Sequence, residues 1–80
     1  MRKYKKNTIL LVDWVDITDH NDWYPEEKAE KKELSKCQSV GYYLNHDNES
    51  LRISSTISGN DRSVIVIPMG CVKKVKKLKE

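Results

Sequence analysis

Lysines gather at the two ends of this 80-residue chain, and they are its clearest sites for chemistry. Arg2 and three lysines give the first six residues a charge of +4, and five lysines against Glu80 give the last ten residues +4. The whole chain carries +3, so residues 7–70 carry 3 − 8 = −5. Basic ends attract phosphate and other anions. Equally, lysines beside a strand can be a solvated edge that prevents sheet-to-sheet pairing.

Two further features point to an anionic ligand. Tyr42 and Tyr43 are neighbours on an expected strand, so one is expected in the core while the ring of the other could stack on a base. Arg52 shares an expected polar face with Ser54, Thr56 and Ser58, which also suits a plain solvated face. The residues predicted to bind the ligand are Lys3, Lys5, Lys6, Tyr43, Arg52, Lys73, Lys74, Lys76 and Lys77. Because lysine offers a point charge and no planar fork, nucleic acid would be bound with little sequence specificity.

The acidic middle of the chain supports a different function. Carboxylates are dense between Asp13 and Glu33, and Trp23 and Tyr24 stand among them. The residues predicted to contact a partner protein are Trp23, Tyr24, Glu26, Glu27 and Glu30. The alternative hypothesis is therefore a protein-interaction factor that inhibits or redirects a host protein.

Catalytic and metal-binding patterns are not apparent. The loop with Asp16, Asp19, His20 and Asp22 lacks the ligand spacing, glycine turn and bidentate Glu of a calcium loop, so it is expected to be a solvated turn. Cys37 and Cys71 do not form a Cys-x-x-Cys pair and are expected to be reduced, although a disulfide stays open. We expect no enzymatic activity, no metal and no cofactor.

The elements that position these residues are mostly strands. Eighty residues suit a single small domain with a thin core. Runs rich in β-branched and apolar residues, separated by turn residues at about ten-residue spacing, predict strands over 8–16, 39–45, 51–58, 64–67 and 72–78. Gly41 inside the second run predicts a bulge or a sharp bend. Residues 1–6 form a basic lead-in.

One helix is predicted, over residues 25–36. Pro25 suits a first helical turn, and Glu26 and Glu27 suit the positive end of the helix dipole. Only Ala29 and Leu34 offer an apolar face, so the helix should lie weakly docked on the surface.

The last segment decides the architecture. Val72, Val75 and Leu78 are three apart, as on a helix, but the Pro68–Gly70 corner before them favours a returning strand. We predict a mainly β protein, a small five-stranded SH3-like or Sm-like barrel with one short helix, in which the last strand pairs antiparallel with the first. That pairing would bring the two basic ends into one patch.

The chain also resembles small proteins encoded by bacteriophages and prophages, which are largely of unknown function. The residues that carry the resemblance are Val12-x-Trp14-x-Asp16, Trp23, Ser39-Val-Gly-Tyr-Tyr-Leu44 and Ile67-Pro-x-Gly-Cys-Val72, followed by a basic tail. Asp22 stands where those proteins commonly have glycine. The resemblance covers roughly residues 9–78 and brings no catalytic motif. It implies a phage accessory protein acting on host machinery, nucleic acid or a host defence signal.

Together these observations predict a non-enzymatic phage accessory protein that binds an anionic ligand, either a nucleotide-type defence signal that it sequesters or nucleic acid. A thin core predicts a homo-oligomer. No apolar run approaches the 18 or so residues of a membrane span, and no signal-type segment is apparent, so the host cytoplasm is the expected location.

Overall fold

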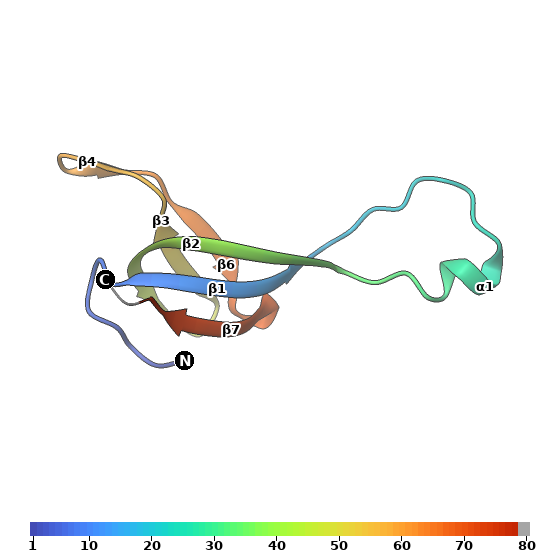
Figure 1. Ribbon diagram of the computed structural model, residues 1–80, viewed down its shortest axis with the longest axis horizontal. Coiled ribbons are helices and arrows are strands. Elements are labelled where there is room, and N and C mark those ends of the chain that lie inside the picture. The colour runs from blue at the N-terminus through green and yellow to red at the C-terminus, as the bar shows by residue number, and fades with distance from the viewer. Residues whose placement is uncertain (79–80) are drawn as a thin grey trace.

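The computed structural model describes residues 1–78 and is mainly β. Its main sheet is five-stranded and antiparallel throughout, in the order β6-β3-β2-β1-β7 (Figure 1). The strands are β1 (Ile9–Asp16), β2 (Ser35–His46), β3 (Ser50–Ser54), β6 (Ile65–Pro68) and β7 (Val72–Lys77), and a small hairpin of β4 (Ile57–Ser58) and β5 (Asp61–Arg62) stands beside them. The five predicted strand regions are thus confirmed, although the third is interrupted after Ser54.

The core lies on the inner face of this sheet and is small. Six apolar side chains are buried there, two from β1, one from β2, two from β3 and one from β6: Leu10, Val12, Tyr43, Leu51, Ile53 and Ile67. They follow the two-residue alternation of strands, which places every second side chain on the same face. The same alternation leaves Ile9, Leu11 and Asp13 on the outer face.

The last segment is a strand, as predicted. A 3₁₀ turn, η1 (Met69–Cys71), forms the corner after Pro68, and β7 returns antiparallel to β1. Val75 lies opposite the buried Val12, and the Leu78 amide donates to the Ile9 carbonyl at 2.9 Å. The first and last strands therefore pair, which is the central topological expectation.

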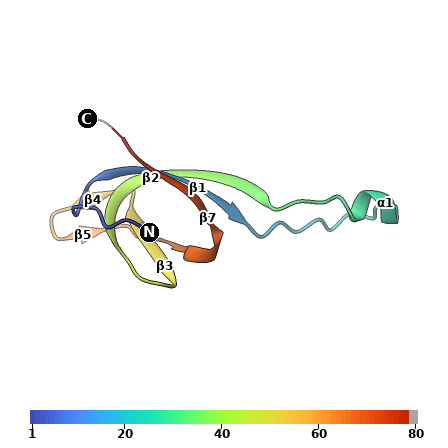
Figure 2. The same ribbon diagram turned by 90° about the horizontal axis from the view of Figure 1, so that it is seen from below.

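The sheet is nevertheless open. Among the described residues β6 and β7 are its two edges and do not pair with each other, so the closed barrel is not confirmed. The curvature comes largely from β2, which bends over the core as it passes into β3 (Figure 2). The predicted irregularity is present as a register shift between Tyr43 and Asn45. Gly41 serves close packing instead, because a Cβ there would lie 2.8 Å from the Ser54 carbonyl oxygen.

Residues 17–34 form an arm that projects from one end of the sheet (Figure 1). The molecule measures 51 × 25 × 25 Å, and its length is due to this arm. The helix predicted over 25–36 is wrong beyond one turn: α1 covers Glu26–Ala29, no side chain caps it, and it buries no residue. With no core contact a helix this short gains too little to extend, and Ser35 and Lys36 pair in β2 instead.

Asp47 organises the turn between β2 and β3. Its carboxylate accepts the amide N–H groups of Glu49 and Ser50 at 2.8 and 2.9 Å, and the Arg52 guanidinium at 3.1 Å. These hydrogen bonds, the two backbone amides first and Arg52 next, lower the pKa of the Asp47 carboxyl below its ordinary value.

We expect Asp47→Asn to destabilise the fold at neutral pH, because the amide cannot replace the charged acceptor. A lowered folded-state pKa means that the ionised carboxylate contributes stability above the unfolded-state pKa and loses it as pH falls through the folded-state pKa. Urea unfolding at several pH values should therefore show the wild type and variant converging in acid. Equal separation of the two midpoints at every pH would contradict this role.

Candidate functional site

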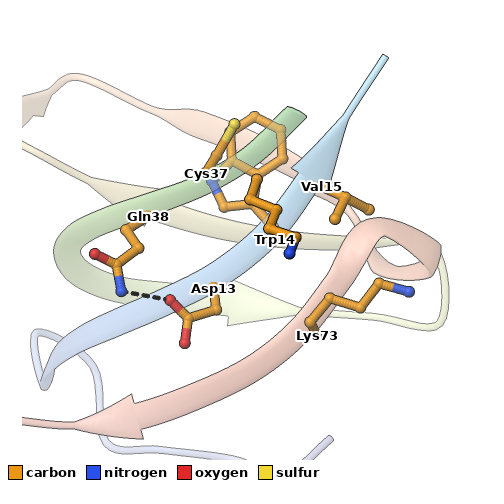
Figure 3. A pocket seen from close by; sticks show the side chains of 7 residues that line it. Asp13, Trp14, Val15, Cys37, Gln38 and Lys73 are labelled. Atoms are coloured by element: carbon orange, nitrogen blue, oxygen red, sulfur yellow. Dashed lines mark hydrogen bonds between the residues drawn. The ribbon is translucent and has the colours of Figure 1, made fainter. Parts of the chain in front are cut away.

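An open groove lies where β1 and β2 leave the sheet to form the arm. It has a volume of about 650 Å³ and a mostly apolar wall (Figure 3). The residues that line this Trp14 groove are Asp13, Trp14, Val15, Lys36, Cys37, Gln38 and Lys73.

Unequal strand lengths create the groove. β7 begins at Val72, opposite Trp14, whereas β1 continues to Asp16 with only β2 beside it. A register shift between Asp13 and Trp14 leaves Lys73 without a partner in the ladder, so its side chain extends beside the groove from the neighbouring strand (Figure 3). The edge of β1 beyond Trp14, at Val15 and Asp16, is thus uncovered and bordered by a lysine.

The polar side chains of the groove are oriented by hydrogen bonds. The Trp14 indole N–H donates to the Ser39 hydroxyl at 3.0 Å, and the Gln38 amide donates to the Asp13 carboxylate at 2.8 Å (Figure 3). Lys36 and Lys73 have no carboxylate within 4.0 Å, since the single ion pair found within residues 1–78 joins Arg52 to Asp47. The groove therefore combines a fixed aromatic wall with two lysines that are available for an anion.

A second hollow, the Tyr43 pocket, lies under the N-terminal segment. It has a volume of about 430 Å³, and its lining includes Lys3, Lys6 and His46. The Tyr43 hydroxyl hydrogen-bonds the Nδ1 atom of His46 at 2.7 Å, and the Tyr4 ring packs edge-on to Tyr43 with the centroids 5.7 Å apart. The basic lead-in is thus held against the sheet through Tyr4.

Two predicted ligand residues have other roles. Tyr43 is 2% exposed and belongs to the core, so its ring cannot stack on a ligand, and Tyr42 is the half-exposed member of the pair. Arg52 holds the Asp47 turn and also donates to Asn45 at 3.0 Å. Ser54, predicted on the same wet face, is fully buried.

The basic ends meet only in part. Pairing of β1 with β7 places Lys77 opposite Leu10, near the start of β1. Lys73 lies four residues earlier in β7, roughly 13 Å away at the rise of a strand. Lys74 and Lys76 lie opposite Asp13 and Leu11 on the outer face. Lys5 is exposed in the lead-in, and Lys79 lies outside the described residues. The predicted single patch is therefore spread over several surfaces.

The predicted partner-binding residues do lie together, on the arm. Trp23 is fully exposed, and Glu26, Glu27 and Glu30 are exposed on and just after α1. Tyr24 is held locally, with the Lys32 ammonium 3.9 Å from its ring centroid. Ile17 and Leu34 are also exposed on the arm. Leu34 was expected to help dock the predicted helix, and Ile17 was not singled out.

Only Lys73 of the groove residues was among the predicted ligand residues, and sequence reasoning gave no ligand-binding role to Asp13, Trp14, Val15, Lys36, Cys37 or Gln38. The strand lengths were a usable signal, because the expected first strand (8–16) is longer than the expected last strand (72–78).

Within residues 1–78 no group of three or more His, Cys, Asp or Glu side chains is placed to hold a metal ion. Cys37 and Cys71 are both free thiols.

No helix in the described part of the chain is long and apolar enough to cross a membrane. Comparisons of the sequence and fold with protein-family models, curated proteins and solved structures found no match.

Proposed function

We propose that this chain is a non-enzymatic binding protein that captures an anionic, nucleotide-type ligand in the Trp14 groove. The observation that carries the proposal is the meeting of one half-buried indole and two lysines, which form no ion pair within residues 1–78, around a cavity of about 650 Å³. Ligand sites commonly have volumes of about 300–1,000 Å³ and an apolar wall with a few polar groups. A base can stack on the indole while phosphates meet the lysines.

The biological setting is part of the proposal. In the phage context that the resemblance implies, tight capture would sequester a host defence signal. Nucleic acid is the alternative anionic ligand, since it also combines bases with phosphates, and a short strand could place one base in the groove. An SH3-like or Sm-like barrel ancestry is supported by the strand order, in which the first strand lies between the second and the last.

Titration calorimetry at low salt with cyclic dinucleotides, mononucleotides and short oligonucleotides tests the proposal. We expect Lys36→Ala with Lys73→Ala to raise the Kd about tenfold or more, because hydrogen bonds to charged groups contribute about 1.5–3 kcal/mol each. Lys3→Ala with Lys6→Ala is the matched control, since it removes two lysines from the Tyr43 pocket instead. In a Trp23→Phe background the fluorescence of Trp14 alone should change on binding.

Three results would contradict the groove assignment. One is the absence of heat with every anion. The second is an equal loss of affinity in the control variant. The third is binding that leaves Trp14 fluorescence unchanged. Loss of affinity in the control alone would move the site to the Tyr43 pocket.

A second function, protein recognition through the arm, is favoured by the full exposure of Trp23. A large aromatic side chain held in solvent among carboxylates is a typical interaction anchor. Affinity capture with the wild type and with a Glu26→Lys, Glu27→Lys, Glu30→Lys variant tests it, and equal recovery of every partner by both would show that the acidic face is not the contact.

A further inference from the structure

The outer face of the sheet carries an uncovered apolar strip. Side chains that pair across antiparallel strands share a face, so Val40, Leu11 and Lys76 form one row across β2, β1 and β7, while Tyr42 and Ile9 form the next row. Val40 is 52% exposed, and the other apolar members are half-buried. Lys74 borders the strip opposite Asp13. We define the outer strip as Ile9, Leu11, Val40, Tyr42, Lys74 and Lys76.

The arm is acidic and carries exposed apolar side chains, so it complements the apolar, basic outer strip. Its exposed apolar side chains are Ile17, Trp23 and Leu34. Residues 17–34 contain six Asp or Glu and three Lys, a net charge of 3 − 6 = −3. The rest of the chain then carries 3 − (−3) = +6. An acidic, apolar arm and a basic body with an apolar strip therefore belong to the same molecule.

A copy cannot join its own arm to its own strip, because the arm extends away from the sheet in both views (Figures 1 and 2). The molecule is 51 Å long and 25 Å wide, and the arm accounts for its length, so the arm lies clear of its own body (Figure 1). A two-fold axis would let two copies exchange arms, since each surface then meets its complement twice.

We propose that the partner of the arm is a second copy of this chain, with Trp23 of each copy docked on the outer strip of the other. The inference rests on the second function above, recognition of a protein by the arm. The strip lies on the outer face, whereas the Trp14 indole that walls the groove lies on the inner face. A standard interface of about 800 Å² per partner is about one eighth of the 6489 Å² surface of one copy.

Sedimentation equilibrium over a range of concentrations tests the proposal on the full chain. The wild type is expected to form a dimer whose Kd rises with ionic strength, because opposite charges at the surface are screened by salt. Val40→Asp should weaken the dimer roughly tenfold or more by placing a charge under the docked indole. Val64→Asp is the matched control, because Val64 has a similar exposure of 50% and lies outside the strip.

A charge exchange makes the test independent of folding defects. One variant carries Glu26→Lys, Glu27→Lys and Glu30→Lys on the arm, and the other carries Lys74→Glu and Lys76→Glu on the strip. Each alone should be monomeric, since arm and strip then repel. A mixture should form a heterodimer, because both contacts regain opposite charges. Circular dichroism confirms that each variant is folded before mixing.

The outcomes separate the possibilities. Heterodimer formation by the mixture, with sensitivity to Val40→Asp and not to Val64→Asp, establishes the exchange. A monomeric wild type at every concentration overturns the inference, as does a dimer unaffected by either charge variant. A monomer whose arm still captures a foreign protein also overturns it, while the arm's role in protein recognition survives.

Discussion

Tyr43→Ala is expected to unfold most of the protein, whereas Tyr43→Phe should remain folded. The Tyr43 ring is 2% exposed and is the largest of the six core side chains. Truncating a buried aromatic residue to alanine costs about 3–5 kcal/mol. A chain of this length has a total stability of about 4–12 kcal/mol at the usual value per residue. The six-residue core indicates the lower end of that range, where the loss removes most of the stability. Removing only the hydroxyl, which bonds to His46 at 2.7 Å, costs about 1 kcal/mol.

Urea unfolding followed by far-UV circular dichroism measures both changes. The alanine variant also decides between the two roles considered for Tyr43. A variant that stays folded and loses only ligand binding would show that the ring acts at a binding surface and would contradict the assignment to the core.

Gly41→Ala should also be strongly destabilising, by about 1–3 kcal/mol. An added Cβ would lie 2.8 Å from the Ser54 carbonyl oxygen and 3.2 Å from the Ile53 Cβ. The first of these neighbours is backbone within the paired strand β3, so relief requires β2 and β3 to separate. Their close approach is what brings Tyr43 and Ile53 onto the same core.

Gly70→Ala provides the control. Nothing lies within 4 Å of the position its Cβ would take, and no positive φ is involved, so its denaturation midpoint should stay near that of the wild type. If the two alanine variants were equally stable, close packing at Gly41 would not be what holds β2 against β3.

Much of the fold was predictable because it depends on local patterns. The β-branched run before Pro68, the 3₁₀ corner and the alternation of Leu10 with Val12 all follow from strand sterics and side-chain periodicity. The pairing of β1 with β7 followed from the corner that turns the chain back. The site was less predictable, because the Trp14 groove depends on where β7 begins relative to the end of β1.

The sequence predictions that proved wrong have physical causes. The 25–36 segment has a helical N-terminal pattern, but propensity without a face to bury does not extend a helix past the turn at Glu26–Ala29. Tyr42 and Tyr43 are equivalent in sequence, and only the register against β1 and β3 decides which ring is buried. Arg52 looked available because its partner, Asp47, belongs to a turn whose geometry the sequence did not specify.

The arm also affects how the chain folds. β1 and β2 could be joined by a loop of about four residues, but 18 residues separate Asp16 from Ser35, its ladder partner. The entropy of closing the longer loop adds roughly 1 kcal/mol to the free energy of the folded state. The pairing of β1 with β7 spans most of the chain, and such long-range pairings slow folding. The arm therefore adds a loop-closure cost to the pairing of β1 with β2, and replacing it with a short turn is a direct way to a faster-folding, more stable sheet.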